Sequence, residues 1–179
     1  MIGNNSKTKN KEKKIKEIKE EDEPPSWHSL SHRKCVLDLE AEYKSPLNGR
    51  VLVVGILETD SQRVRIFFDR NEEVMLRRVI RCFNQENYDQ LIGYNIGHDL
   101  RCLLGRCMKY QLSAASIFSV PCYDVMMKFK KIRNDIASYN KSGTLDEWSL
   151  FVLGEGKKEK TSSVSSLYHQ NKVTELIEY

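Results

Sequence analysis

Two carboxylates stand at alternate positions in an apolar run near the start of the chain. The run reads Cys-Val-Leu-Asp-Leu-Glu, from Cys35 to Glu40. Side chains of a β-strand alternate between its faces, so Asp38 and Glu40 share one face, about 6.6 Å apart at ~3.3 Å per residue. Paired carboxylate oxygens are ligands that Mg²⁺ and Mn²⁺ prefer. A bare Asp-x-Glu pair is more commonly found on a solvated sheet face, so the motif by itself does not establish a metal site.

A third acid lies in the segment Gly-Tyr-Asn-Ile-Gly-His-Asp-Leu, residues 93–100. Asp99 follows Ile96 by three residues and precedes Leu103 by four, so it borders the buried stripe of a predicted helix and is expected to face the sheet. Asn95 lies where a short predicted strand meets this helix, a position suited to an N-cap. Ligands of open α/β sheets also bind at such junctions. Taken alone, Asp99 is equally consistent with a cap or a salt bridge.

The elements that must position these acids form an α/β pattern. Three strands with short connections predict an antiparallel meander, after which helices alternate with short strands, as in a mixed sheet flanked by helices. Strands are predicted at residues 34–42, 50–59, 63–68, 90–95 and 120–125, and helices at 71–85, 96–109, 126–136, 144–153 and 171–179. Thr144 and Glu147 have the spacing of a capping box. In the helix at 96–109, Leu100, Leu103 and Leu104 are expected on the buried side.

Composition sets the class of protein. The chain has 179 residues, 40% hydrophobic, with a net charge of +4, which permits a polyanionic partner without requiring one. Residues 1–33 are charge-dense and predict a solvated helix or disordered tail, leaving 34–179 as one domain. The longest apolar run, Val51–Leu57, is too short for a membrane span. The five cysteines form no CxxC pair and there is no secretory signal, so we expect a reduced intracellular protein, cytoplasmic or nuclear, with no membrane partner.

Taken together, the two acidic motifs resemble those of the RNase H-like 3′–5′ exonucleases of the DEDD class. Asp38 and Glu40 match the first motif, and Asn95 and Asp99 match the second, with the meander between them. The Gly-Tyr-Asn opening looks especially like the exonucleases of family-B polymerases. The segment Gly-Thr-Leu-Asp-Glu-Trp-Ser-Leu-Phe-Val-Leu-Gly-Glu-Gly-Lys-Lys, residues 143–158, is similar to their helix ending in Leu-Gly-x-Gly-Lys-Lys. The resemblance covers residues 34–179.

The chain departs from the family pattern at two positions. His98 stands where the family usually has Phe or Tyr beside the second-motif Asp. The third motif is Tyr-x-x-x-Asp. Tyr179 stands where its Tyr is expected, and the Asp would fall beyond the last residue. The resemblance therefore implies either a domain that is incomplete at its C-terminal side or one that has lost a carboxylate, and weak or absent activity in this form.

The resemblance also implies a mechanism and partners. Two Mg²⁺ or Mn²⁺ ions would be held by the acids at 38, 40 and 99 around the scissile phosphate, with Tyr179 orienting the attacking water. A single-stranded DNA or RNA 3′ end would be the substrate, within a larger polymerase, helicase or nuclease assembly. The residues it implies for substrate binding are Asn95, Arg101, Lys157 and Lys158; Arg106, Lys109 and Lys160 are further cationic candidates, and Tyr94 and Trp148 are candidates for stacking on bases or for core packing.

Two other interpretations remain beside the exonuclease. The first is a catalytically inert RNase H-like module that binds nucleic acid or a protein. The second is an unrelated α/β binding domain whose acids are solvated.

Overall fold

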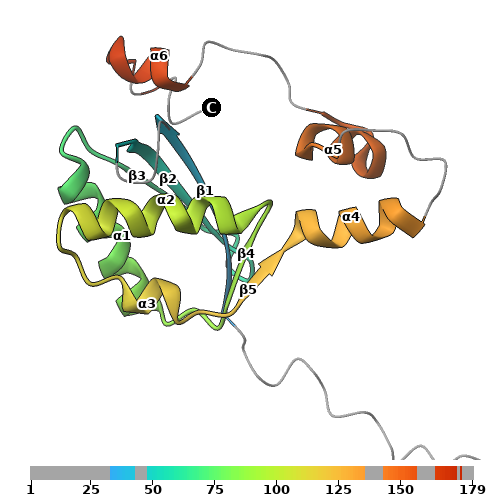
Figure 1. The fold of residues 1–179 in the computed structure, drawn as a ribbon, viewed down its shortest axis with the longest axis horizontal. Coiled ribbons are helices and arrows are strands. Elements are labelled where there is room, and N and C mark those ends of the chain that lie inside the picture. Colours follow the sequence, from blue (N-terminus) through green and yellow to red (C-terminus); the bar gives the residue numbers. More distant parts are fainter. Residues whose placement is uncertain (1–32, 43–47, 136–142, 157–163, 173, 175–179) are drawn as a thin grey trace, which may run out of the picture. The chain divides into compact units, whose positions relative to one another are not determined.

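The computed structural model describes residues 33–42, 48–135, 143–156, 164–172 and 174 (Figure 1). Within them the chain forms a single five-stranded sheet and six helices. The strands are β1 (Lys34–Glu42), β2 (Arg50–Glu58), β3 (Val64–Phe68), β4 (Gln90–Gly93) and β5 (Cys122–Asp124). The helices are α1 (Glu72–Glu86), α2 (Ile96–Lys109), α3 (Ala115–Phe118), α4 (Val125–Asp135), α5 (Leu145–Leu153) and α6 (Val164–His169). No helix in these ranges is both long and apolar enough to cross a bilayer.

The sheet has the order β3-β2-β1-β4-β5 (Figure 1). β1, β2 and β3 pair antiparallel, whereas β4 lies parallel to β1 and β5 parallel to β4. This confirms the predicted α/β fold, an RNase H-like mixed sheet made of a three-strand antiparallel meander plus parallel strands. The helices α3 and α6 were not predicted. The predicted tail at 1–33, apart from Arg33, and most of the helix predicted at 171–179 lie outside the described residues.

The main core lies between one face of the sheet and the apolar sides of α1 and α2. Cys35 and Leu37 of β1 are fully buried in it, as period-2 alternation requires. Leu103 of α2 is also fully buried there. The expectation for Leu104 was wrong, because this side chain is 43% exposed. Successive helix positions differ by about 100°, which turns Leu104 away once Leu103 points into the core.

β2 contains a β-bulge that lets one strand serve two cores. The register shifts between Glu40 and Ala41 of β1, which leaves Leu52 as an extra residue between Val51 and Val53. Val51 packs into the main core, and the neighbouring Leu52 points to the other face. There Leu52 meets α6 in a second, smaller core. The bulge thus shifts the alternation of β2 by one residue: Val54 faces the main core, Val53 and Leu52 both face the second core, and Val51 returns to the main core.

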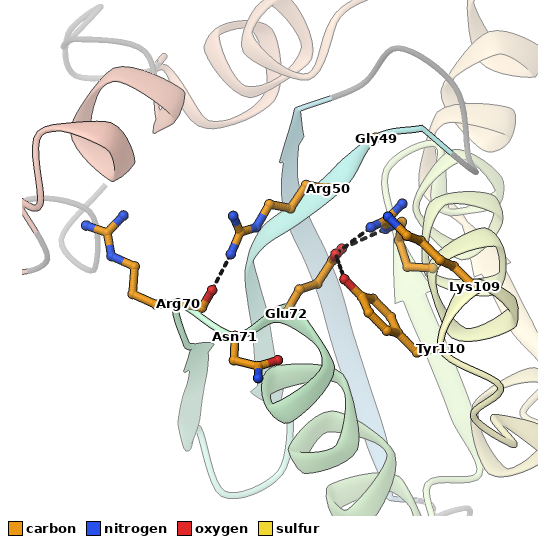
Figure 2. Close-up of a pocket in the computed structure, with 8 residues that line it drawn as sticks. Gly49, Arg50, Arg70, Asn71, Glu72, Lys109 and Tyr110 are labelled. Carbon is orange, nitrogen blue, oxygen red and sulfur yellow. Dashed lines mark hydrogen bonds and ion pairs between the residues drawn. The ribbon is translucent and has the colours of Figure 1, made fainter.

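A buried ion pair joins the two main helices (Figure 2). Glu72 and Arg106 are each only 3% exposed, and the guanidinium donates from Nε and Nη2 to the two carboxylate oxygens over 2.8 and 2.6 Å. The Val51 backbone N–H and the Tyr110 hydroxyl also donate to Glu72, over 2.7 and 2.9 Å. One carboxylate therefore ties α1 to both α2 and β2. Arg106, considered above as a phosphate contact, is instead committed to this pair.

A pocket of about 460 Å³ opens beside this ion pair (Figure 2). It is lined by Gly49, Arg50, Arg70, Asn71, Glu72, Arg106, Lys109 and Tyr110. Arg50 donates a hydrogen bond to the backbone carbonyl of Arg70. The Arg50 and Arg70 guanidiniums both lie over the ring of Tyr168 in α6, 5.0 and 4.5 Å from its centroid. These cations therefore hold α6 against the sheet through cation–π contacts.

The helix α5 follows its predicted start and end. Thr144 and Glu147 form the capping box, and Gly154, with φ of 74°, ends the helix in the left-handed region. Trp148 is buried and stacks on Phe129 of α4 with ring centroids 4.5 Å apart, so it packs in the interior and is not available to stack on bases.

Candidate active site

The acid pair on β1 stands on the sheet face opposite the main core. Asp38 is exposed and Glu40 half-buried, whereas their neighbour Leu37 is buried on the other side. Across the strand pair, Asp38 lies opposite Gly55 and Glu40 opposite Val53. The alternation predicted for this run is therefore present, with both carboxylates on one face.

The turn from β4 into α2 packs tightly against β1 because of Gly93. A Cβ atom at Gly93 would lie 2.7 Å from Cδ1 of Ile96 and 3.1 Å from the carbonyl oxygen of Leu37. Both separations are shorter than ordinary contacts, and the Leu37 carbonyl belongs to the residue just before Asp38. Glycine at this position thus lets the start of α2 approach the strand that bears the acids.

Replacing Gly93 by alanine is expected to cost about 1–3 kcal/mol of unfolding free energy, because the added methyl overpacks a site with no room. The matched control is Gly97→Ala in α2, where a Cβ would meet only a side-chain nitrogen of Arg101, at 3.9 Å. That change should be neutral or stabilising by up to about 1 kcal/mol, because alanine favours helix. Urea unfolding of both variants measures the difference. Equal stabilities of the two would contradict the assigned packing.

Asn95 begins α2 in an unusual backbone conformation. Its φ of 60° and ψ of 37° lie in the left-handed region, which asparagine tolerates better than most residues. Asn95 occupies the N-cap position of α2, as predicted, but its side chain makes no capping hydrogen bond. Its backbone N–H donates instead to Oδ1 of Asp124 over 3.0 Å, and Met126 N–H donates to the same oxygen over 3.0 Å. Asp124 therefore fastens the turn before α2 to the end of β5.

Asp99 lies in the first turn of α2 and is 7% exposed, as expected for a side chain that faces the sheet. Burial, the largest cause, and the negative charges of Asp38, Glu40 and Asp124 together raise the pKa of Asp99 to about 7. The fold therefore brings Asp99 within electrostatic reach of both strand acids. Among the described residues, no cation acts on the pKa of Asp99.

This arrangement agrees with a site for a hard cation. Its donors are carboxylate oxygens, and the excess negative charge around a buried acid is what a divalent ion would neutralise. Without such an ion the negative charges repel one another. In the described part of the chain, no three His, Cys, Asp or Glu side chains are placed so that they could together hold a metal ion.

Asp124 is the acid that sequence reasoning missed. It ends a strand of only three residues, too short to show a period. Its place at the carboxyl end of a parallel strand, beside the Asn95 turn, was the available signal.

The remaining predicted residues are distributed differently. Arg101 is exposed on α2, as is Lys109. His98 places Nε2 3.8 Å from Sγ of Cys102. The Tyr94 hydroxyl donates to the carbonyl of Gly143. Lys157, Lys158, Lys160 and Tyr179 lie outside the described residues.

Comparison with known proteins identifies a similar fold. The chain resembles the structure of the family B DNA polymerase from the hyperthermophilic archaeon Pyrobaculum calidifontis, with a TM-score of 0.53 and 17% sequence identity. The match covers 66% of this chain and 18% of the polymerase, so the chain spans a small part of that protein's length. No family model and no curated protein matches the sequence.

Proposed function

We propose that this chain carries a divalent-metal-dependent nuclease domain of the DEDD 3′–5′ exonuclease type, which hydrolyses phosphodiester bonds at the 3′ ends of single-stranded nucleic acid. The buried Asp99 of α2, within electrostatic reach of Asp38 and Glu40 of β1 on a sheet of RNase H-like topology, supports this most directly. The likeness to a family B DNA polymerase agrees with a nucleic-acid partner.

In the proposed site the three carboxylates share the task of binding metal. Asp38, Glu40 and Asp99 would hold two Mg²⁺ or Mn²⁺ ions, which when bound supply the Lewis acidity for attack of water on the phosphate. Burial keeps Asp99 away from bulk water, and Asp124 holds the turn that positions its helix.

The other residues would act on water and on the strand being cut. Tyr179 is proposed to orient the attacking water with its hydroxyl. The proposed contacts with the nucleic-acid strand are Asn95, Arg101, Lys157 and Lys158.

Metal binding is the primary test, because it does not depend on the third motif. Titration with Mn²⁺, followed by calorimetry, should show binding that Asp38→Asn weakens at least about tenfold, since a lost ligand worth ~1.4 kcal/mol or more gives that factor. Asp60→Asn is the matched control, because Asp60 is exposed in the turn between β2 and β3. Its affinity should equal that of the unmodified chain. Equal binding by all three proteins would refute the site.

Cleavage is the second test. Single-stranded DNA and RNA labelled at the 3′ end are incubated with Mn²⁺ and either the unmodified chain or Asp38→Asn. Release of label by the unmodified chain only would support hydrolysis at these acids. Binding of the labelled strand without any release is expected both of the catalytically inert module and of a nuclease domain whose third motif is incomplete, so metal binding by the three acids distinguishes them from a domain whose acids are solvated.

A further inference from the structure

Gly55 occupies a position in β2 where glycine needs an explanation. It lies in the interior of the strand, directly opposite Asp38, with Ile66 of β3 on its other side. Glycine in a strand interior weakens the strand, because it loses more backbone entropy on folding and brings no side chain to pack.

Neither usual structural reason for glycine applies at Gly55. Its φ is not positive; in the part of the chain that the structure describes, the glycines with positive φ are Gly143 and Gly154. A Cβ atom at Gly55 would meet only the backbone oxygen of Asp38 among the described residues, at 3.8 Å, which is an ordinary contact. Gly93, by contrast, has no room for a methyl group. The sheet could accommodate a side chain at Gly55, but the sequence has none there.

The missing side chain would stand beside the proposed metal-binding carboxylate. Residues directly opposite in an antiparallel pair project from the same face with Cβ atoms about 4.5–5.5 Å apart, so a side chain at Gly55 would be a neighbour of Asp38. Val53 and Leu57 flank Gly55 on that face and Ile66 lies across from it, all of them half-buried. Next to Asp38 the sheet surface therefore consists of the bare backbone of Gly55, bordered by apolar side chains.

We propose that Gly55 is the point at which the nucleoside part of the 3′-terminal nucleotide approaches the sheet, and that the missing side chain keeps this approach to Asp38 open. A nucleotide whose phosphate would be held through divalent ions bound at Asp38 must place its sugar and base beside this acid, and a bare backbone with apolar borders suits a flat ring. This inference rests on the proposed function and adds the position that admits the nucleoside.

The test uses the full chain, the variants Gly55→Ala and Gly55→Val, and two probes that differ by the nucleoside. Calorimetry in Mn²⁺ measures binding of thymidine 5′-monophosphate and of inorganic phosphate. We expect the nucleotide affinity to fall stepwise from Gly to Ala to Val, by at least about tenfold for Val, because the added methyl groups occupy the ring's place. Inorganic phosphate and Mn²⁺ should bind with affinities unchanged within about twofold, since the carboxylates are untouched.

Thermal unfolding separates this effect from misfolding. Valine favours strands, so Gly55→Val should melt about 2 °C or more above the unmodified chain even as it loses the nucleotide. Unchanged nucleotide affinity in Gly55→Val would overturn the inference. A parallel loss of Mn²⁺ or phosphate binding would also overturn it, because the side chain would then be disturbing the acids. An unmodified chain that binds Mn²⁺ without binding the nucleotide overturns this inference alone, whereas absence of Mn²⁺ binding overturns the proposed function with it.

Discussion

Replacing Arg106 by alanine is expected to lower the free energy of unfolding by about 3–5 kcal/mol, a large part of the stability of a domain of this size. The cost arises because the variant leaves the Glu72 carboxylate buried without its cationic partner. Glu72 is 3% exposed, so water cannot replace the guanidinium without opening the junction between α1 and α2. Urea unfolding at pH 7 measures the loss.

The same pair predicts the pH dependence of stability. Burial acts to raise the pKa of Glu72, but hydrogen bonds from Arg106, the Val51 N–H and Tyr110 outweigh it, and the pKa lies below its ordinary value of 4.5. A pKa that is lower in the folded state contributes stability above the unfolded pKa and loses it as pH falls through the folded value. The difference between the unmodified chain and Arg106→Ala should therefore be full at neutral pH and shrink below pH 4.5.

The matched control is Arg77→Ala on α1. Arg77 also pairs with a glutamate, Glu73, over 2.7 Å, but its side chain is 59% exposed. An exposed pair at this helical spacing contributes only about 0.3–0.5 kcal/mol. A loss in Arg106→Ala no larger than the loss in Arg77→Ala would show that the buried pair does not hold the helices together.

Replacing Asp99 by asparagine is expected to raise the stability of the metal-free protein and to lower its affinity for metal. Asparagine keeps the shape of the side chain and removes a charge that is buried near Asp38, Glu40 and Asp124. With metal removed by a chelator at pH 8, Asp99→Asn should be more stable than the unmodified chain by about 1–2 kcal/mol, because the like charges no longer repel a desolvated carboxylate. Thermal unfolding in chelator measures this gain.

Mn²⁺ should bind the same variant at least about tenfold more weakly, because the proposed site loses an anionic ligand. Mn²⁺ should correspondingly raise the melting temperature of the unmodified chain more than that of Asp99→Asn. Destabilisation of the metal-free variant would mean that the Asp99 charge is already compensated within the protein. Unchanged Mn²⁺ affinity would remove Asp99 from the set of ligands.

Local patterns in the sequence were sufficient to place the candidate acids. Strict alternation put Asp38 and Glu40 on one face of β1, and helical spacing turned Asp99 toward the sheet. Both inferences need only the period of one element, which the residues themselves display. The cap of α5 followed from Thr144 and Glu147 for the same reason.

Contacts between elements were not predictable in this way. Glu72 lies in the first turn of α1, where acids are favourable for the helix dipole alone. Nothing near it in the sequence indicates that it forms an ion pair with Arg106 of α2. The helix α6 is six residues long and contains two serines, so its own propensity is weak. It forms where Leu52 of β2 offers an apolar surface, a tertiary contact that the periodicity of neither segment reveals.

The extra residue in β2 has a consequence for how the molecule could be altered. Because Val51 and Leu52 point to opposite sides, the layer formed by α6 is anchored independently of the layer formed by α1 and α2. The segment that contains α6 could therefore be redesigned or replaced, for instance by a reporter or a binding loop. The main core would keep its own set of residues. Two adjacent residues of one strand thus belong to two cores that can be altered separately.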